Sequence, residues 1–191
     1  MENKILVETS ARHMHLTKEA VEALYGAGAE LIVKKMLSQP GQFAADNAKI
    51  KLVGPKGEMM VSVLGPTRPA TQVELSYSDA RALGLKDVPV RESGDVAGTP
   101  GVKLVGPAGE ITIDEGVIIA KRHIHFNPEQ AAGLGVENGE VVKVLIKSDR
   151  TTIYDDVVCR VNPNYDLAMH IDTDECNAAG AFGVVYGEIV K

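Results

Sequence analysis

The stretch Ala120-Lys121-Arg122-His123-Ile124-His125-Phe126-Asn127 sets the fold and the chemistry of this chain. Its two histidines stand two residues apart, so in a β-strand both side chains leave the same face, about 7 Å apart along the strand. Ile124 then points the other way, into apolar packing. A lone His-x-His often belongs to a strand surface or a satisfied core. Two imidazoles on one face can nevertheless reach one metal ion, so the stretch predicts a ligand-bearing strand.

A near copy of this motif, Ser10-Ala11-Arg12-His13-Met14-His15-Leu16-Thr17, lies close to the start of the chain. Four of the five histidines fall in these two Arg-His-x-His units, and His170 is the fifth. The arginine, the histidine pair and the following hydrophobe all recur. This repetition favours two metal centres of similar construction over scattered surface histidines.

Four segments share one order of residues, which is a ligand, a hydrophobe and a helix N-cap residue. We find this order in His15-Leu16-Thr17, Glu74-Leu75-Ser76, His125-Phe126-Asn127 and His170-Ile171-Asp172. Thr, Ser, Asn and Asp are good N-cap residues. Turns from strand to helix often read this way without any function, but the first position here is always His or Glu. Two sets of three candidate ligands follow: His13, His15 and Glu74, and then His123, His125 and His170.

Zinc accepts histidine nitrogens and carboxylate oxygens, and a catalytic zinc keeps three protein ligands and one open position. Each set offers three ligands, which counts against a closed structural site. Arg68 lies six residues before Glu74, in a loop that contains Pro66 and Pro69. A guanidinium suits bidentate capture of phosphate. The alternative for Arg68 is a surface arginine without a task.

The length of 191 residues allows one domain or two small ones. Hydrophobic residues make up 45% of the chain and aromatic residues only 4%, so the core consists mainly of aliphatic side chains. Many short strands and few helices predict small β-barrels with short capping helices, not a doubly wound sheet. Residues 51–58 and 103–110 are similar hairpins, and their order relative to the histidine pairs favours two interleaved halves.

The net charge of −6 argues against a nucleic-acid partner, because no basic stripe can neutralise phosphates. No stretch has the length of a membrane helix or the pattern of a signal peptide, so we expect a cytoplasmic protein without a membrane partner. Cys159 and Cys176 show no metal-ligand spacing, and two idle thiols in a reducing compartment are favoured over a disulfide.

These residues resemble the PduL-type phosphotransacylases, which are also called phosphate propanoyltransferases. The matching segments keep the family's order along essentially the whole chain. They are residues 10–16, 37–45, 65–68, 71–74, 90–95, 120–125 and 169–175. The resemblance implies reversible transfer of a short acyl group, propanoyl or acetyl, between coenzyme A and inorganic phosphate, with acyl phosphate as the product.

The resemblance also implies two zinc ions per chain, one on each set of three ligands, and Arg68 as a catalytic phosphate contact. It implies a mainly β fold of two interleaved barrels, residues 1–12 plus 120–191 and residues 13–119. We expect a homodimer. Three basic residues are candidates for further substrate contacts: Arg12, Lys121 and Arg122. Family members in bacterial microcompartments usually carry an N-terminal extension. His13 comes early here, so we expect either a cytosolic member or a member whose extension has been removed, and a place in the microcompartment lumen stays open.

Two other functions stay open. A di-zinc hydrolase of thioesters or phosphate esters would use the same ligands with water as the acceptor. A non-catalytic, metal-stabilised binding module would need closed sites with four ligands. If the protein is an acyltransferase, we expect the acyl group to pass directly from coenzyme A to phosphate without an acyl-enzyme. Neither Cys159 nor Cys176 has an obvious base beside it.

Overall fold

The structure is a computed structural model that describes residues 2–190. Within that range it consists mostly of short strands, with four short helices. The predicted mainly β fold with short capping helices is confirmed. The chain divides into two compact units. We call residues 2–10, 38–40 and 121–190 the barrel unit, and residues 11–37 and 41–120 the central unit.

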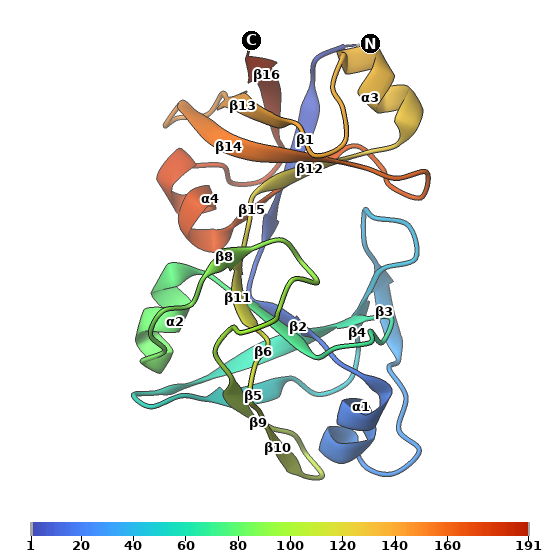
Figure 1. Ribbon diagram of the computed structural model, residues 1–191, viewed down its shortest axis with the longest axis vertical. Coiled ribbons are helices and arrows are strands. Elements are labelled where there is room, and N and C mark those ends of the chain that lie inside the picture. The colour runs from blue at the N-terminus through green and yellow to red at the C-terminus, as the bar shows by residue number, and fades with distance from the viewer. Residues whose placement is uncertain (1, 191) are drawn as a thin grey trace. The chain divides into compact units, whose positions relative to one another are not determined.

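The barrel unit is a closed barrel in the strand order β1-β15-β12-β14-β13-β16 (Figure 1). Its strands are β1 Ile5–Ser10, β12 His123–Phe126, β13 Val141–Ile146, β14 Thr152–Val161, β15 Ala168–Asp172 and β16 Val185–Val190. In Figure 1 the blue strand β1 lies among strands coloured from yellow to red. It pairs in parallel with β15 and antiparallel with β16. Segments far apart in the sequence therefore close this barrel.

The inside of the barrel unit is filled by alternating strand residues. Ile5 and Val7 of β1 are buried and belong to the same cluster as Ile124 and Met169. Ile124 is fully buried, as expected for the residue between two histidines that leave the opposite face. The helices of this unit are α3 Pro128–Leu134 and α4 Thr173–Ala179.

The central unit is a ten-stranded sheet that curls into a half-barrel. Its main path runs β10-β9-β5-β6-β2-β7-β11-β8, and β4 joins β3 to β6. The strands are β2 His13–His15, β3 Val33–Met36, β4 Phe43–Ala45, β5 Ile50–Val53, β6 Glu58–Gly65, β7 Gln72–Leu75, β8 Val90–Arg91, β9 Val102–Val105, β10 Glu110–Ile113 and β11 Val117–Ala120. The helices are α1 Lys18–Tyr25 and α2 Tyr77–Leu83.

The two hairpins of similar sequence lie in the same unit and pair with each other. β5 runs antiparallel to β9, with Leu52 opposite Leu104. The bounds expected for the central part, residues 13–119, include both hairpins. The resemblance of the hairpins marks a repeat within the central unit, because the two copies form neighbouring strands of one sheet.

Each hairpin turn also holds the end of a helix. The backbone N–H of Lys56 donates to the carbonyl of Leu83 at the end of α2, and that of Ala108 donates to Leu24 in α1. A Cβ on Gly106 would lie only 2.3 Å from that Leu24 oxygen. The turn therefore needs glycine for close approach of backbone to backbone. Helices α1 and α2, which follow the ligand strands of this unit, are thus fixed at their C-terminal ends.

The strands that carry the candidate ligands are paired alike in both units. β2 runs antiparallel to β7 and parallel to β6. β12 runs antiparallel to β15 and parallel to β14. Each unit therefore places a His-x-His strand directly beside the strand of its third ligand. No helix within residues 2–190 has the length and apolar character needed to span a bilayer.

Candidate functional site

All four helices begin directly after a strand that carries a candidate ligand, as the residue order predicts. The Thr17 hydroxyl accepts a hydrogen bond from the Ala20 N–H at 3.1 Å and caps α1. Ser76, Asn127 and Asp172 cap α2, α3 and α4, each in a reciprocal capping box. These caps fix the backbone two residues beyond a ligand, so the ligand end of each strand is held in place.

The first ligand set lies across the antiparallel pair β2/β7, where His13 stands directly opposite Glu74. The ligand atoms of His13, His15 and Glu74 all lie within 4.8 Å of one another, and all three residues are buried. One Glu74 oxygen, Oε2, lies 3.5 Å from His13 Nε2, and the other, Oε1, lies 4.0 Å from His15 Nε2. Three donor atoms that converge in a buried place can hold a metal ion.

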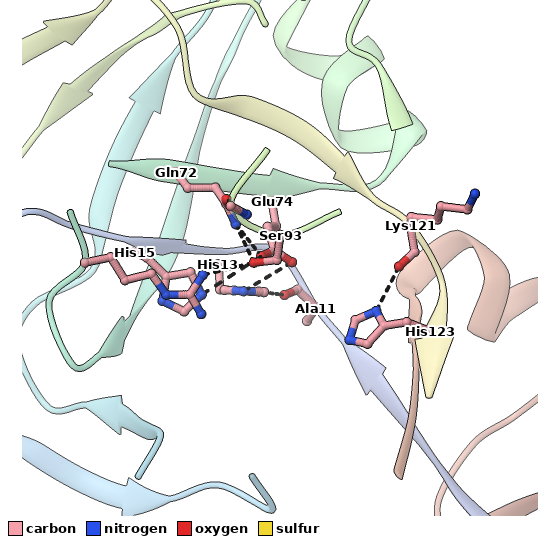
Figure 2. A network of polar contacts seen from close by, with 10 residues as sticks. Ala11, His13, His15, Gln72, Glu74, Ser93, Lys121 and His123 are labelled. Carbon is pink, nitrogen blue, oxygen red and sulfur yellow. Dashed lines mark hydrogen bonds and ion pairs between the residues drawn. The ribbon is translucent and has the colours of Figure 1, made fainter. Parts of the chain in front are cut away.

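A polar network orients these ligands (Figure 2). His13 Nδ1 lies 3.0 Å from the Ala11 carbonyl, so its other nitrogen faces Glu74. Glu74 Oε1 accepts hydrogen bonds from Gln72 Nε2 at 2.6 Å and from the Ser93 hydroxyl at 2.9 Å. The Gln72 amide oxygen accepts in turn from the N–H of Gly94 at 2.6 Å. Hydrogen-bonded ligands of this kind are typical of metal sites, where the surrounding partners fix ligand orientation.

Two of the three groups in the first set favour the form that binds a cation, and His13 is the exception. Burial would lower the pKa of His13, but the charge and hydrogen bond of Glu74 raise it, so a metal ion would have to displace a proton there. Burial, then His13 and Arg68, lower the pKa of His15 to about 3. Burial alone would raise the pKa of Glu74, but the charge and hydrogen bond of His13 hold that pKa well below its usual value. His15 is therefore neutral and Glu74 ionised near neutral pH, and these are the forms that bind metals.

Arg68 is connected to the first set through one hydroxyl group. Its Nη1 donates to Ser93 Oγ at 2.9 Å, and that hydroxyl donates to Glu74. The backbone N–H of Arg68 donates to the Leu16 carbonyl just beyond His15, at 2.9 Å. The guanidinium is thereby held beside the ligands, where it can face an anion.

The second ligand set lies across β12/β15, where His123 stands opposite His170. The three ring centroids are close: 4.6 Å for His123–His125, 5.2 Å for His123–His170 and 5.0 Å for His125–His170. His123 Nδ1 lies 2.8 Å from the Lys121 carbonyl (Figure 2), as His13 does from Ala11. His170 Nε2 lies 3.7 Å from a carboxylate oxygen of Glu8.

The two sets differ in how closely their ligand atoms converge. Among residues 2–190, the first set is the one whose ligand atoms all lie within 4.8 Å. In the second set the rings are gathered, but the buried Nδ1 of His125 has no hydrogen-bond partner. Burial, then His123 and His170, lower the pKa of His125 to about 2, so this ring stays neutral. A neutral, buried nitrogen without a partner is a fit donor for a metal ion.

The three basic residues expected near the substrates each contact a carboxylate of their own unit. Arg12 pairs with Asp79. Lys121 lies 3.2 Å from Asp156, and Arg122 lies 2.9 Å from Glu175. These contacts are compatible with a structural task for the three side chains.

Sequence reasoning missed the residues that surround the ligands. Gln72 stands two residues before Glu74 on the same strand face, so the period of two could have identified it. Ser93 and Gly94 lie in a segment that matches the family pattern, but their spacing from Glu74 gives no signal. The proximity of Glu8 to His170 follows from the pairing of β1 with β15. Such a pairing cannot be read from local sequence.

Comparison with known proteins supplies the class of chemistry. The family model described as phosphate propanoyltransferase matches residues 6–182. A protein of Leptotrichia buccalis is 52% identical over 191 residues, covering 100% of this chain and 90% of its own length. A protein of Listeria monocytogenes is 48% identical over 192 residues, covering 100% and 89%. One of Thermotoga maritima is 51% identical over 177 residues, covering 92% and 83%.

All three relatives are named phosphate propanoyltransferase. The match includes both ligand sets and the Arg68 loop, because these lie within residues 6–182. The chain therefore belongs to the phosphate propanoyltransferase family and is an acyltransferase.

Proposed function

We propose that the protein is a phosphate acyltransferase that moves a propanoyl or acetyl group between coenzyme A and inorganic phosphate with the help of two zinc ions. The observation that carries this proposal is the buried convergence of His13, His15 and Glu74 beside Arg68. A cation site next to a fixed guanidinium suits two substrates that are both anionic. The names of the relatives support the same substrates.

The first zinc ion is held by His13, His15 and Glu74 in this proposal, and the second by His123, His125 and His170. Each set offers three protein ligands, which leaves a position for substrate. A bound zinc ion supplies a Lewis acid that stabilises negative charge on sulfur or oxygen. The chain's own contribution is to hold the imidazoles and one ionised carboxylate in place before the substrates arrive.

Arg68 binds phosphate in this proposal. A guanidinium has five N–H donors in a rigid fork, and phosphate oxygens accept them two at a time. The contact with Ser93 fixes the side chain, so less conformational entropy is lost when phosphate binds. Arg68 thus brings the phosphate oxygen to the thioester carbonyl, which is catalysis by proximity and orientation.

The acyl group passes directly from sulfur to phosphate. A phosphate oxygen forms the new bond to the carbonyl carbon, the carbon–sulfur bond breaks, and coenzyme A leaves as the thiolate. Both thiols of the chain are buried. Burial, then Glu140, raise the pKa of Cys159 to about 11, and Cys176 Sγ lies 3.2 Å from the Ala181 carbonyl as a donor. Neither is placed as an activated nucleophile.

The test is an assay of acyl phosphate formed from propanoyl-CoA or acetyl-CoA, trapped as the hydroxamate, with and without inorganic phosphate. We expect acyl phosphate to form, thiol release to depend on phosphate, and two zinc ions to be present per chain. Thiol release that continues at full rate without phosphate would show a thioester hydrolase instead. Absence of turnover with a full zinc content would show a metal-stabilised binding module.

A further inference from the structure

The arginine before the first histidine pair contacts a helix cap. Arg12 Nη1 donates to Oδ1 of Asp79, which is the third residue of α2. The other oxygen of that carboxylate, Oδ2, accepts from the N–H of Ser76, the N-cap residue. Ser76 follows Glu74 by two positions. One carboxylate thus joins the residue before His13 to the backbone just beyond the third ligand.

The arginine before the second histidine pair does the same in the barrel unit. Arg122 Nε donates to Oε1 of Glu175 at 2.9 Å, and Glu175 is the third residue of α4. Its Oε2 accepts from the N–H of Asp172, the N-cap residue, at 3.0 Å. Asp172 follows His170 by two positions. The guanidinium also lies over the ring of Tyr154, 4.9 Å from its centroid.

The two other helices have different first turns. The third residue of α1 is Ala20, which has no side-chain acceptor. The third residue of α3 is Gln130, whose side-chain nitrogen donates to Asp166 at 3.2 Å. An acidic residue that divides its two oxygens between an arginine and an N-cap is therefore found on α2 and α4. These are the helices that follow the third ligand of each set.

We infer that Arg12 and Arg122 are positioning residues that lock the third ligand of each set against its histidine pair, and that they do not bind substrate. In each unit the third ligand and the histidine pair lie on two antiparallel strands, β2/β7 and β12/β15. The ion pair ties these strands together at the end where the ligands stand. This inference rests on the proposed function, because it assumes that the two sets hold metal.

The carboxylate end of each ion pair is largely buried, whereas the Arg12 and Arg122 side chains are 45% and 30% exposed. The Asp79 side chain is 11% exposed and the Glu175 side chain is 19% exposed. A carboxylate that already accepts a backbone N–H has a fixed orientation, so the arginine meets a preformed acceptor. Loss of a group that orients metal ligands typically weakens metal binding by about 10- to 100-fold.

The experiment measures zinc affinity in full-length chains that keep one ligand set. The His170→Ala chain reports the first set, and the Glu74→Ala chain reports the second. Zinc is titrated against a chromophoric chelator. In the His170→Ala chain, Arg12→Gln should weaken zinc binding by about 10-fold, and Asp79→Asn should do the same while it keeps an oxygen for the Ser76 N–H. Arg12→Lys should restore most of the affinity.

The matched control tests each arginine variant in the chain that reports the other ligand set. Arg122→Gln should leave the zinc affinity of the His170→Ala chain unchanged and weaken that of the Glu74→Ala chain. The double variant Arg12→Gln, Asp79→Asn should lose no more affinity than either single change, because both remove one interaction.

Two results would overturn the inference in different ways. A lowered melting temperature with unchanged zinc affinity would give Arg12 and Arg122 a merely structural role and leave the proposed function intact. If the unaltered chain binds no zinc at all, the proposed metal function fails, and the positioning role fails with it.

Discussion

The two ligand sets share a scaffold and differ in their donors. Both lie on an antiparallel strand pair, and in both an arginine reaches the cap of the following helix. In the central unit the position opposite His15 is Gln72, whose amide donates to Glu74. In the barrel unit the position opposite His125 is Ala168, which has no polar side chain. Glu74 is therefore held by a side-chain donor from the position opposite His15, and the second set has no counterpart of that donor at Ala168.

The donors also differ in charge. A zinc ion on His13, His15 and Glu74 would keep one net positive charge. A zinc ion on three neutral imidazoles would keep both of its positive charges. The carboxylate of Glu8, 3.7 Å from His170 Nε2, would offset part of this charge. The same backbone arrangement can thus give two metals of unequal electrophilicity. We expect the second set to attract an anionic oxygen more strongly than the first.

The largest effect is expected from loss of one ligand in either set. His170→Ala should lower the zinc content from two ions to one and reduce kcat by about 1,000-fold, because Lewis-acid stabilisation is worth several kcal/mol. Glu74→Ala should do the same at the other set. Metal analysis and the acyl-phosphate assay measure both. A His170→Ala protein with full zinc and normal turnover would remove the second set from the site.

Replacement of Arg68 is expected to have a smaller effect on activity. It should change the binding of phosphate and leave the binding of acyl-CoA nearly unaltered. Arg68→Ala should raise the KM for phosphate by about 10- to 100-fold, since a charge-assisted contact is worth about 1.5–3 kcal/mol. The KM for acyl-CoA should change far less. Arg81→Ala, which removes an exposed arginine of α2, serves as the control. Equal changes in both KM values would mean that Arg68 does not select phosphate.

The hydrogen-bond network of the first set can be tested by itself. Ser93→Ala removes the donor to Glu74 and the acceptor of Arg68. It should weaken zinc binding at the first set by about 10-fold and leave the second set unchanged. Ser78→Ala, on the exposed side of α2, is the matched control. Weakening of both sets to the same degree would contradict a local role for Ser93.

The smallest effect is expected from the thiols. The double variant Cys159→Ala, Cys176→Ala should keep more than about half of the activity, because neither thiol is an activated nucleophile. Its melting temperature should fall, since both side chains belong to the core of the barrel unit. Initial rates should require a ternary complex. Parallel double-reciprocal lines, or an acyl label trapped on Cys176, would show an acyl-enzyme.

Much of the local structure was predictable from the sequence. Thr17, Ser76, Asn127 and Asp172 were expected as N-caps, and all four cap a helix. Caps and the hydrophobe before them act over a few residues, so the sequence carries the whole signal. Four of the six ligand candidates were predicted from the period of two within a strand, and Glu74 and His170 from the order of ligand, hydrophobe and N-cap residue.

The pairing of strands was not predictable. The sequence does not say that His13 stands opposite Glu74, or that the two similar hairpins share one sheet. Register depends on contacts between distant segments, and a shift by one residue would turn each side chain to the other face. The network of Gln72, Ser93 and Gly94 follows from that register. It is therefore a property of the folded sheet and not of any local pattern.

The place of β1 in the barrel unit has a consequence for the order of folding. β1 is synthesised before β15 and β16, and the whole central unit is translated between them. Contacts of such long sequence separation form late, because loop closure must be achieved first. The central unit can fold on the ribosome before β15 and β16, the partner strands of β1, have been synthesised. Ile5 and Val7, which are buried in the folded barrel unit, then stay exposed until β15 and β16 have been synthesised, and exposed apolar segments of this kind favour aggregation.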